Sequence, residues 1–302
     1  MISGGEILCS VIIPVYRHWD DLNRALSALE RQTLERDAFE VIVVDNDNDN
    51  DNDNDPGQGP AISGTSLNVR VVSCDAPGSY AARNAGIEHA RGAIVAFTDA
   101  DCQPDADWLR QGLSAMENRA FGLVAGPVLL EPALPGRPGV AEHYDMLMGI
   151  RQERYVRRGY AATANLFVRR ALFDVVGVFD SHRYSGGDAE FCRRAGAAGF
   201  RIGYAQAALV RHPARATAGA LVSKARRLKG GQVTRGPLRH RVFWVVRTFL
   251  PPVLRCARLM LSRTAPAGLG RRFDLCRLQL YLWWCEVGEV RRLLGGGEPL
   301  RG

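Results

Sequence analysis

The sequence predicts an α/β fold, in which a mostly parallel, mixed sheet is flanked by helices and followed by a basic helical appendage. In the first half of the chain, short segments rich in Val and Ile alternate with segments of helical spacing, the pattern of βαβ units. The chain has 302 residues, enough for one large domain and an appendage. Its charge is unevenly divided: residues 221–302 contain 17 Lys and Arg against 4 Asp and Glu, whereas residues 1–220 are net acidic.

Four apolar segments in the first half have the length and composition of buried strands. The expected strands are residues 10–16 (SVIIPVY), 39–45 (FEVIVVD), 69–74 (VRVVSC) and 93–101 (AIVAFTDAD). The helices expected between and after them are residues 20–32, 79–91 and 105–116. In the first helix, Leu22, Ala25, Leu26 and Leu29 recur at positions i, i+3, i+4 and i+7, as on the buried face of an amphipathic helix.

The pattern is less regular from about residue 117 onward. We expect a strand at 121–130, a strand with a short helix at 164–180, a Gly-rich turn entering a helix at 185–200, and a strand, RIGYAQAALVRHP, that ends at His212. The rest is expected to be helical, with breaks at Gly230-Gly231, Pro251-Pro252 and Pro266. The chain is therefore divided into a domain at 1–220 and a basic amphipathic helical tail at 221–302.

Several classes of protein are excluded by what the sequence lacks. Its seven Cys include no Cys-x-x-Cys pair, which argues against a disulfide framework or a zinc ribbon and favours the cytoplasm. The first residues, MISGGEILCSVIIPVY, have no basic start and are not expected to be a signal peptide. No uncharged apolar run approaches the ~18 residues that span a bilayer.

Acidic side chains follow the expected strands. Asp45 ends the second strand, and Asp99 and Asp101 end the fourth. Ligands of parallel sheets bind beyond the carboxyl ends of the strands, so these side chains are expected at the ligand-binding edge. Turns also collect Asp, but two carboxylates at i and i+2 after a buried strand favour binding of Mg²⁺ or Mn²⁺. Cys102 lies beside them, although such hard cations prefer oxygen ligands.

Five motifs occur in a characteristic order. They are VIIPVY, FEVIVVDN, AARNAGIEHARGAIVAFTDADCQP, ANLFVRRALFDVVGVFD and GGDAEFCRRAGAAGF. In their order and spacing, residues 10 to 212 resemble a family 2 glycosyltransferase with the GT-A fold. The resemblance implies an inverting, metal-assisted transfer of a sugar from a nucleotide-diphosphate donor to an acceptor hydroxyl on a glycan or a lipid-linked molecule.

The resemblance also implies roles for particular residues. Donor-binding positions are Pro14, Tyr16, Asp45, Arg83, Asn84 and Asp99. Metal-binding positions are Asp101, together with Asp99 and His212, for Mg²⁺ or Mn²⁺. Asp188 matches the general base. Gly187 stands where the family often has Glu, so Glu190 remains a rival for that role.

Asp and Asn alternate strictly from Asp45 to Asp55. Asp45 is expected to meet the nucleotide base, and Asn46 to belong to the same edge. Residues 47–66 are expected to form a flexible low-complexity loop. The run resembles a calcium loop, but it lacks the central Gly and distal Glu of an EF-hand.

Two other functions remain open at this point. A sugar-nucleotide pyrophosphorylase also has a parallel sheet with acidic metal ligands, but the segment after the first strand, PVYRHWDD, has no glycine. A calcium-binding or scaffold protein would rest on the Asp-Asn run and the tail. The tail itself is expected to lie on an anionic membrane surface, peripherally at the cytoplasmic face. Packing on the catalytic domain or on another subunit is its alternative, and nucleic acid is not an expected partner.

Overall fold

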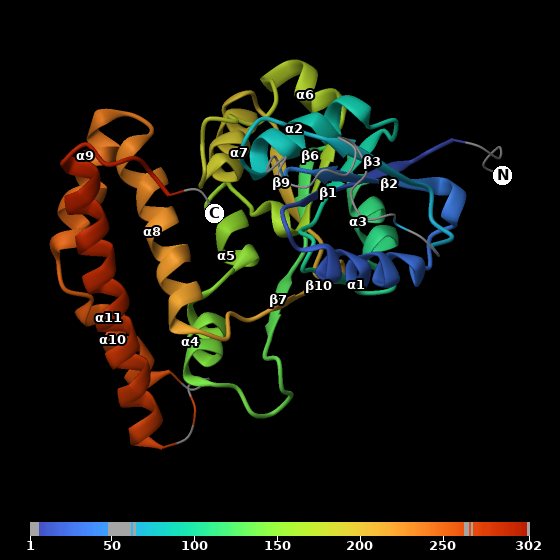
Figure 1. The fold of residues 1–302 in the computed structure, drawn as a ribbon. Helices are drawn as coiled ribbons and strands as arrows, with labels where there is room; N and C mark the ends of the chain where they lie inside the picture. The colour runs from blue at the N-terminus through green and yellow to red at the C-terminus, as the bar shows by residue number, and fades with distance from the viewer. Residues whose placement is uncertain (1–5, 48–61, 63–64, 263–265, 267, 301–302) are drawn as a thin grey trace, which may run out of the picture. The chain divides into compact units, whose positions relative to one another are not determined.

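The computed structural model describes residues 6–47, 62, 65–262, 266 and 268–300. The chain forms two compact units (Figure 1). The first, here called the sheet unit, consists of Met1–Leu129, Arg151–His182 and Gly187–His212. The second, here called the helical unit, consists of Leu130–Ile150, Arg183–Gly186 and Pro213–Gly302. The division at residue 220 stays a prediction about which part folds by itself.

The sheet unit is built on a seven-stranded sheet with the order β3-β2-β1-β4-β8-β6-β9. Its strands are β1 (Cys9–Val15), β2 (Phe39–Asp45), β3 (Val69–Ser73), β4 (Ile94–Phe97), β6 (Phe121–Ala125), β8 (Leu166–Arg169) and β9 (Arg201–Tyr204). The strands pair in parallel except at β8, which runs antiparallel to both β4 and β6. The predicted mostly parallel, mixed sheet is confirmed.

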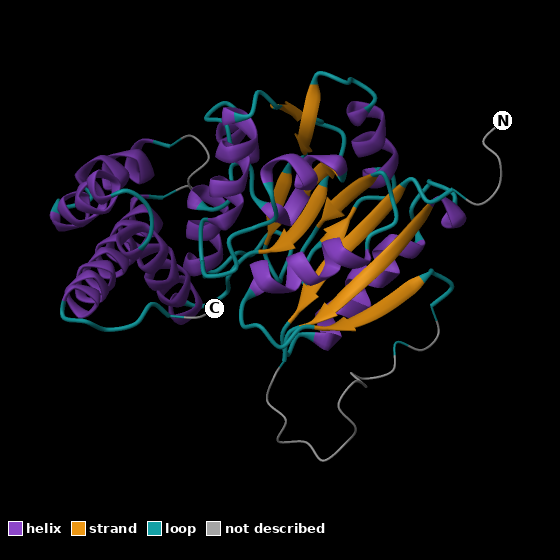
Figure 2. Cartoon of the chain, turned by 90° about the horizontal axis from the view of Figure 1, so that it is seen from above, coloured by secondary structure: helices purple, strands orange, loops and turns teal. Residues whose placement is uncertain are grey.

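Helices cover both faces of this sheet (Figure 2). They are α1 (Trp19–Glu30), α2 (Ser79–His89), α3 (Trp108–Met116), α5 (Gln152–Val156), α6 (Ala171–Val176) and α7 (Gly187–Ala197), with 3-10 turns η1 (Arg36–Ala38) and η2 (Thr163–Asn165). Figure 1 shows α1 and α3 on one face and α2, α6 and α7 on the other. Because both faces are covered, β1, β2 and β4 can be apolar almost throughout.

The α2 face of the sheet is packed closely. A Cβ atom added to Gly86 of α2 would lie 2.5 Å from Cγ2 of Ile12 in β1, so glycine is what allows the helix to approach the strand. Around this contact, Phe97, Phe173, Phe179 and Phe191 are buried and stack edge to face or tilted. Each ring contributes about 1.5–3 kcal/mol by burial. This packing fixes α2 and α7 at the carboxyl edge of the sheet.

Two strands expected from the sequence are each divided. The segment 121–130 forms β6 and then β7 (Val128–Glu131), and the segment RIGYAQAALVRHP forms β9 and then β10 (Val210–Pro213). The second member of each pair belongs to a small sheet with the order β5-β10-β7, where β5 is Gln103–Pro104. The chain bends at Gly126, where a Cβ atom would lie 2.0 Å from the carbonyl oxygen of Ala208.

The helical unit contains α4 (Val140–Met148), α8 (Ala218–Thr234), α9 (Leu238–Phe249), α10 (Val253–Leu261) and α11 (Leu269–Leu294). The long α11 packs on each of the other four. The buried centre is apolar and consists of Ala141, Tyr144, Leu147, Leu221, Leu259, Leu275 and Leu282. No helix among the described residues has the length and hydropathy to cross a membrane.

The expected breaks in the tail are only partly right. The prolines at 251 and 252 separate α9 from α10, and Pro266 lies between α10 and α11, as predicted. In contrast, α8 continues through Gly230-Gly231. A Cβ atom on Gly231 would lie 2.6 Å from the carbonyl oxygen of Ser185, so this glycine serves close packing within the helical unit and not a break.

Candidate active site

The sequence-predicted site residues lie on segments at the carboxyl edge of the parallel strands. Asp45 ends β2, and Asp99 and Asp101 stand in the turn that follows β4. Arg83 lies on α2, and Asp188 is the second residue of α7. The expectation that acidic groups gather at this edge rested on strand order alone; their side-chain contacts come from the structure.

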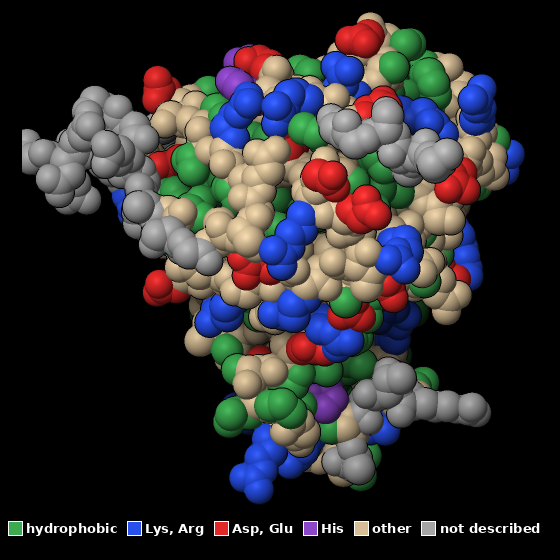
Figure 3. Space-filling view, turned by 90° about the vertical axis from the view of Figure 1, so that its right-hand side faces the viewer, with side chains coloured by type: hydrophobic (Ala, Val, Ile, Leu, Met, Phe, Trp, Pro, Cys, Tyr) green, Lys and Arg blue, Asp and Glu red, His purple; other side chains and the backbone are tan. Residues whose placement is uncertain are grey.

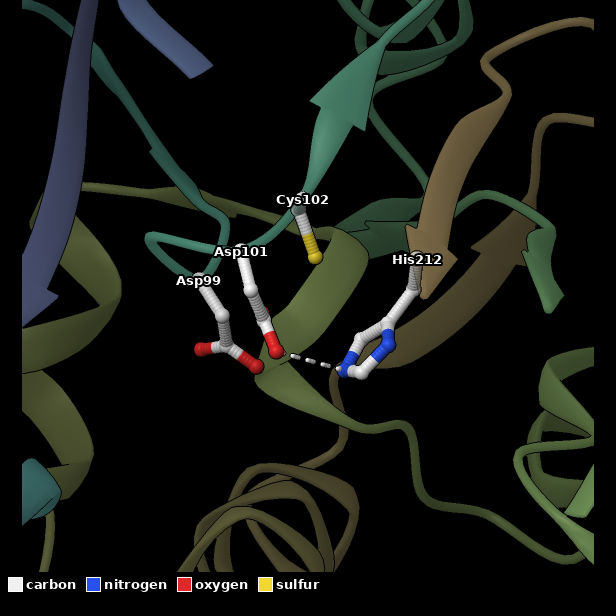
Figure 4. A group of neighbouring side chains, drawn as sticks. All are labelled: Asp99, Asp101, Cys102 and His212. Atoms are coloured by element: carbon white, nitrogen blue, oxygen red, sulfur yellow. Dashed lines mark ion pairs between the residues drawn. The ribbon is translucent and has the colours of Figure 1, made fainter. Parts of the chain in front are cut away.

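Four potential metal ligands cluster there: Asp99, Asp101, Cys102 and His212 (Figure 4). One ligand atom from each lies within 4.8 Å of the others. Nε2 of His212 is 3.5 Å from Oδ2 of Asp101. The antiparallel pairing of β10 with β5, which sets Arg211 opposite Gln103, brings His212 beside the turn after β4. A residue more than 100 positions away is thus held against the Asp-x-Asp motif.

The donor set suits an oxygen-preferring cation. Two carboxylates and an imidazole are ligands that Mn²⁺ accepts, and the carboxylates also suit Mg²⁺. The Cys102 thiol is fully buried, and burial, followed by the negative charges of Asp99 and Asp101, raises its pKa well above the ordinary value. Hard cations such as Mg²⁺ and Mn²⁺ also prefer oxygen ligands to sulfur.

Arg83 connects the acidic pair to α2. Its Nη2 lies 2.5 Å from Oδ1 of Asp99, and its Nη1 donates to the carbonyl of Ser79 at 3.2 Å. The guanidinium also lies 5.5 Å from the centre of the Tyr80 ring. Arg83 is only 4% exposed, and its Nε has no hydrogen-bond partner among the described residues. A buried cation is therefore held directly against a carboxylate of the motif.

Asp188 is held by its own helix and by α2. Its Oδ1 accepts a hydrogen bond from the amide of Ala189 at 2.8 Å, and the Tyr80 hydroxyl donates to its carboxylate. Burial raises the pKa of Asp188 above its ordinary value; these hydrogen bonds and the charge of Arg83 oppose the increase without cancelling it. Sequence reasoning missed Tyr80, although its spacing of three residues from Arg83 puts both on one face of α2.

The structure gives a physical reason for the glycine before Asp188. A Cβ atom added to Gly187 would lie 2.8 Å from Cε2 and 2.9 Å from Cδ2 of Tyr80. The Tyr80 ring occupies the space that any side chain at position 187 would need. The glycine at position 187, where the family often has Glu, therefore leaves the space in which the Tyr80 ring lies when its hydroxyl donates to Asp188.

The rival carboxylate, Glu190, is engaged elsewhere. It accepts hydrogen bonds from Nε and Nη2 of Arg194 at 2.8 and 3.1 Å. Arg194 also donates to the carbonyls of Val176 and Val178. This ion pair ties α7 to the segment that follows α6.

The remaining residues predicted to bind the donor base lie at the carboxyl ends of β1 and β2. Pro14 pairs with Val44 in the sheet, and Tyr16 follows β1, its ring 5.1 Å from the Arg17 guanidinium. Asp45 accepts the amide of Asp47 at 3.0 Å, and burial raises its pKa. Residues 48–61 and 63–64 of the expected 47–66 loop lie outside the described residues.

Two asparagines have structural contacts that the sequence did not reveal. The buried Asn46 donates to the carbonyls of Cys74 and Ala76 at 2.8 Å each and accepts the amide of Gly78 at 2.9 Å, so it fixes the approach to α2. Asn84 exchanges two hydrogen bonds with the backbone of Phe179, at 2.8 and 3.0 Å. Both side-chain amides hold backbone segments around the site.

The fold and the site define a class of enzyme. A mostly parallel sheet presents an Asp-x-Asp motif after a central strand, with a histidine and a further carboxylate nearby, and its structural neighbours are GT-A glycosyltransferases. The model for "Glycosyl transferase family 2" matches residues 10–175. The chain therefore belongs to glycosyl transferase family 2, and it is a glycosyl transfer enzyme. The pyrophosphorylase and scaffold alternatives are replaced by this finding.

Curated relatives agree with the family. The chain is 35% identical over 291 residues to glycosyltransferase AglE of Haloferax volcanii, which covers 93% of each chain. It is 27% identical to the amylovoran biosynthesis glycosyltransferase AmsB of Erwinia amylovora, over 65% of this chain and 66% of that one.

Among solved structures, the mannosyltransferase PcManGT from Pyrobaculum calidifontis, in complex with GDP-Man and Mn²⁺, is similar with a TM-score of 0.55 and 17% identity. The similarity covers 95% of this chain and 74% of that one. At this level of identity the likeness concerns the fold.

Proposed function

We propose that this glycosyltransferase transfers a sugar from a nucleotide-diphosphate donor to an acceptor hydroxyl with inversion, using Asp188 as the general base. The observation that carries the proposal is the position of Asp188. It is half-buried, it accepts a hydrogen bond from Tyr80, and it feels the charge of Arg83, which pairs with Asp99. Inverting transfer needs one such carboxylate and no protein nucleophile.

The proton transfer follows from the chemistry of the carboxylate. As the acceptor oxygen bonds to the anomeric carbon, its proton passes to Asp188 and the bond to the diphosphate breaks. A carboxylate whose pKa is raised by burial is a stronger base when ionised. Glu190 is less suited to this role because both of its oxygens already accept from Arg194.

The departing diphosphate gains negative charge, which a bound cation and a nearby arginine would stabilise. Asp101, Asp99 and His212 would hold Mg²⁺ or Mn²⁺, which stabilises such a leaving group when bound. Arg83 adds a permanent positive charge next to Asp99. We assign it to orient Asp99 and to hold donor oxygens.

The donor nucleotide is proposed to lie at the ends of β1 and β2. Tyr16 and Pro14 would contact the base, and Asp45 would accept hydrogen bonds from it. Asn84 contributes indirectly, because its amide is used to hold the backbone of Phe179 against α2. Asp99 completes the set at the sugar side.

The test is ligand binding separated from turnover. The purified protein is titrated with nucleotide sugars and free nucleoside diphosphates in the presence of Mn²⁺ or Mg²⁺, and the thermal midpoint is followed. Asp188→Asn should keep the stabilisation by the donor and lose transfer. If no nucleotide in the panel stabilises the wild type with either cation, the donor site is wrong.

The acceptor is proposed to be a growing glycan or a lipid-linked sugar in the synthesis of a cell-envelope polysaccharide. The similarity to AmsB, whose name refers to amylovoran biosynthesis, supports this class of pathway. A glycan acceptor presents the hydroxyl that Asp188 would deprotonate.

The helical unit is proposed to hold the enzyme at an anionic membrane surface on the cytoplasmic side. Between residues 238 and 261 there are five Arg and no acidic residue. The same segment exposes large apolar side chains, namely Leu238, Val242, Phe243, Val246, Phe249, Leu250, Val253, Leu254 and Leu261. Basic helices with exposed apolar residues bind such surfaces. By contrast, the face displayed in Figure 3 intersperses Lys and Arg with Asp and Glu.

A further inference from the structure

The helical unit contains a small hollow, with an enclosed space of about 20 Å³ and an open mouth, that no sequence motif indicates. It is formed between α8, α9, the turn at Leu250–Pro252, α10 and α11. The side chains that matter are three cations, two indoles and one carboxylate: Lys229, Arg247, Arg255, Trp244, Trp283 and Glu286.

The positive charge in this hollow exceeds the negative charge. Lys229 is only 5% exposed, and its Nζ lies 3.3 Å from Oε2 of Glu286. Burial lowers the pKa of Lys229, Glu286 opposes this, and the charges of Arg255 and Arg247 lower it further. Within the described part of the chain, no carboxylate forms an ion pair with Arg247 or Arg255. The hollow thus holds three cations and one carboxylate, and that carboxylate pairs with Lys229.

The walls are held in place by hydrogen bonds. Nε1 of Trp283 on α11 donates to the carbonyl of Thr248 on α9 at 2.7 Å. The Thr248 hydroxyl donates back to the carbonyl of Trp244 at 2.7 Å, and the Lys229 ammonium lies 5.3 Å from the centre of the Trp244 ring. These contacts join α8, α9 and α11, so Arg247 extends from a preformed frame. Arg255 extends from α10, which packs on α11.

We propose that this hollow binds the phosphate of an anionic lipid headgroup. Arginine presents several N–H donors in a fixed fork that matches phosphate oxygens. One phosphodiester carries a single negative charge and would therefore neutralise half of the excess positive charge of Arg247 and Arg255. The inference rests on the proposed attachment of the helical unit to membranes and names the site that would recognise the lipid.

A lipid is favoured over a soluble phosphate ester because of what surrounds the hollow. Leu250 both lines it and is 53% exposed. The helices on either side of this turn expose Val246, Phe249, Val253 and Leu254. Apolar side chains around a cationic hollow suit a headgroup whose acyl chains lie next to it, and tryptophan is favoured at such interfaces.

The experiment compares two double variants that lose the same charge from α9 and α10. In the pocket variant, Arg247→Gln and Arg255→Gln are combined; in the control, the exposed Arg239 and Arg258 are changed to Gln. Each full-length protein is sedimented with vesicles of phosphatidylglycerol and phosphatidylcholine, and with vesicles of phosphatidylcholine alone. Donor-dependent thermal stabilisation confirms that each variant is folded.

We expect the pocket variant to lose about tenfold or more affinity for the anionic vesicles beyond the loss of the control, since each arginine would form charge-assisted hydrogen bonds with the phosphate. An Arg247→Lys, Arg255→Lys variant keeps the positive charge and loses the forked N–H donors. Its affinity for the anionic vesicles should lie between that of the control and that of the pocket variant. Equal losses in the pocket and control variants would overturn the site but leave membrane attachment intact.

Two further outcomes are informative. One distinguishes a lipid phosphate from a soluble phosphate, and the other tests the phosphate site together with membrane attachment. If glycerol phosphate or inorganic phosphate raises the thermal midpoint of the wild type through Arg247 and Arg255 while anionic vesicles do not bind, a soluble ligand replaces the lipid. If the wild type binds no vesicle and no phosphate, both the pocket and the membrane attachment are wrong. Sugar transfer is measured separately, and the proposal that the protein transfers a sugar does not depend on either result.

Discussion

Gly187 offers a sharp test of the arrangement around Asp188. In Gly187→Ala, the new Cβ would lie 2.8, 2.9 and 3.0 Å from three carbons of the Tyr80 ring. Favourable carbon contacts lie at about 3.5–4.0 Å, so the ring must move by roughly half an ångström or more. The ring is packed 5.7 Å from that of Phe179, centre to centre, which limits its escape.

The expected effect on stability follows from this crowding. Overpacking of a buried site lowers the free energy of unfolding by about 1–3 kcal/mol. The opposite sign is expected for Gly196→Ala in the same helix. Apart from its chain neighbours and the backbone of its own helix, no described atom lies within 4 Å of the added Cβ. That control should raise the free energy of unfolding by about 0.5–1 kcal/mol, because alanine favours helix more than glycine does.

The rate of sugar transfer should also change when the Tyr80 ring is displaced. When the Tyr80 ring moves, its hydroxyl no longer donates to Asp188, and a hydrogen bond to a charged group contributes about 1.5–3 kcal/mol. We expect kcat of Gly187→Ala to fall by roughly tenfold to a hundredfold, with the acid limb of the pH–rate profile displaced to higher pH. Tyr80→Phe should displace that limb in the same direction.

The assay is urea unfolding of the two alanine variants at pH 7, together with pH–rate profiles for sugar transfer. Equal free energies of unfolding for Gly187→Ala and Gly196→Ala would refute the crowding by Tyr80. A normal acid limb in Tyr80→Phe would show that the hydroxyl does not position the base, even if stability changed as expected.

Three other predictions concern charge. Because burial raises the pKa of Asp188, the stability that comes from its neutral form is lost as the pH rises through that pKa. Asp188→Asn should therefore unfold at a higher urea concentration than the wild type at pH 8 and should lose this advantage at low pH. It should also transfer sugar at least about 100-fold more slowly. Removal of Mn²⁺ with EDTA should abolish thermal stabilisation by the donor, and Asp101→Asn should weaken the Mn²⁺ response in titrations without donor. Burial would raise the pKa of Asp145, but Lys224 and Arg215 hold that pKa below its ordinary value. The stability that the ionised Asp145 contributes is therefore lost as the pH falls through the lowered pKa. Asp145→Ala should lower the free energy of unfolding at pH 7 by about 3–5 kcal/mol in urea titrations.

Much of the sheet unit was predictable because its signals are local. The alternation of Val- and Ile-rich segments with amphipathic ones predicted β1 to β4 and α1 to α3, and the order of the motifs predicted the family. Asp99 and Asp101 were predictable as a pair because the turn after a central strand of a parallel sheet lies at the ligand-binding edge. These inferences need only the neighbours of each residue in the chain.

The errors occur where distant segments decide the local structure. The expected strand 121–130 ran through Gly126-Pro127, a pair that often marks a turn, and the structure divides it there into β6 and β7. That these two strands join different sheets depends on their partners elsewhere in the chain. Similarly, the glycines at 230 and 231 resemble a helix break, but close packing against Ser185 accounts for Gly231 within a continuous α8. Backbone conformation at glycine is permissive, and tertiary contacts select among the options.

The sequence by itself therefore determined the family, the mixed sheet and the identity of the acidic motif. Only the tertiary structure decided how the side chains meet: the pairing of β10 with β5 brings His212 to Asp101, and Tyr80 both crowds Gly187 and donates to Asp188. It also decided that Arg247 and Arg255 share one hollow. The physical reason is that such contacts join residues far apart in the chain, whose meeting depends on the packing of whole elements and leaves no periodic pattern in the sequence.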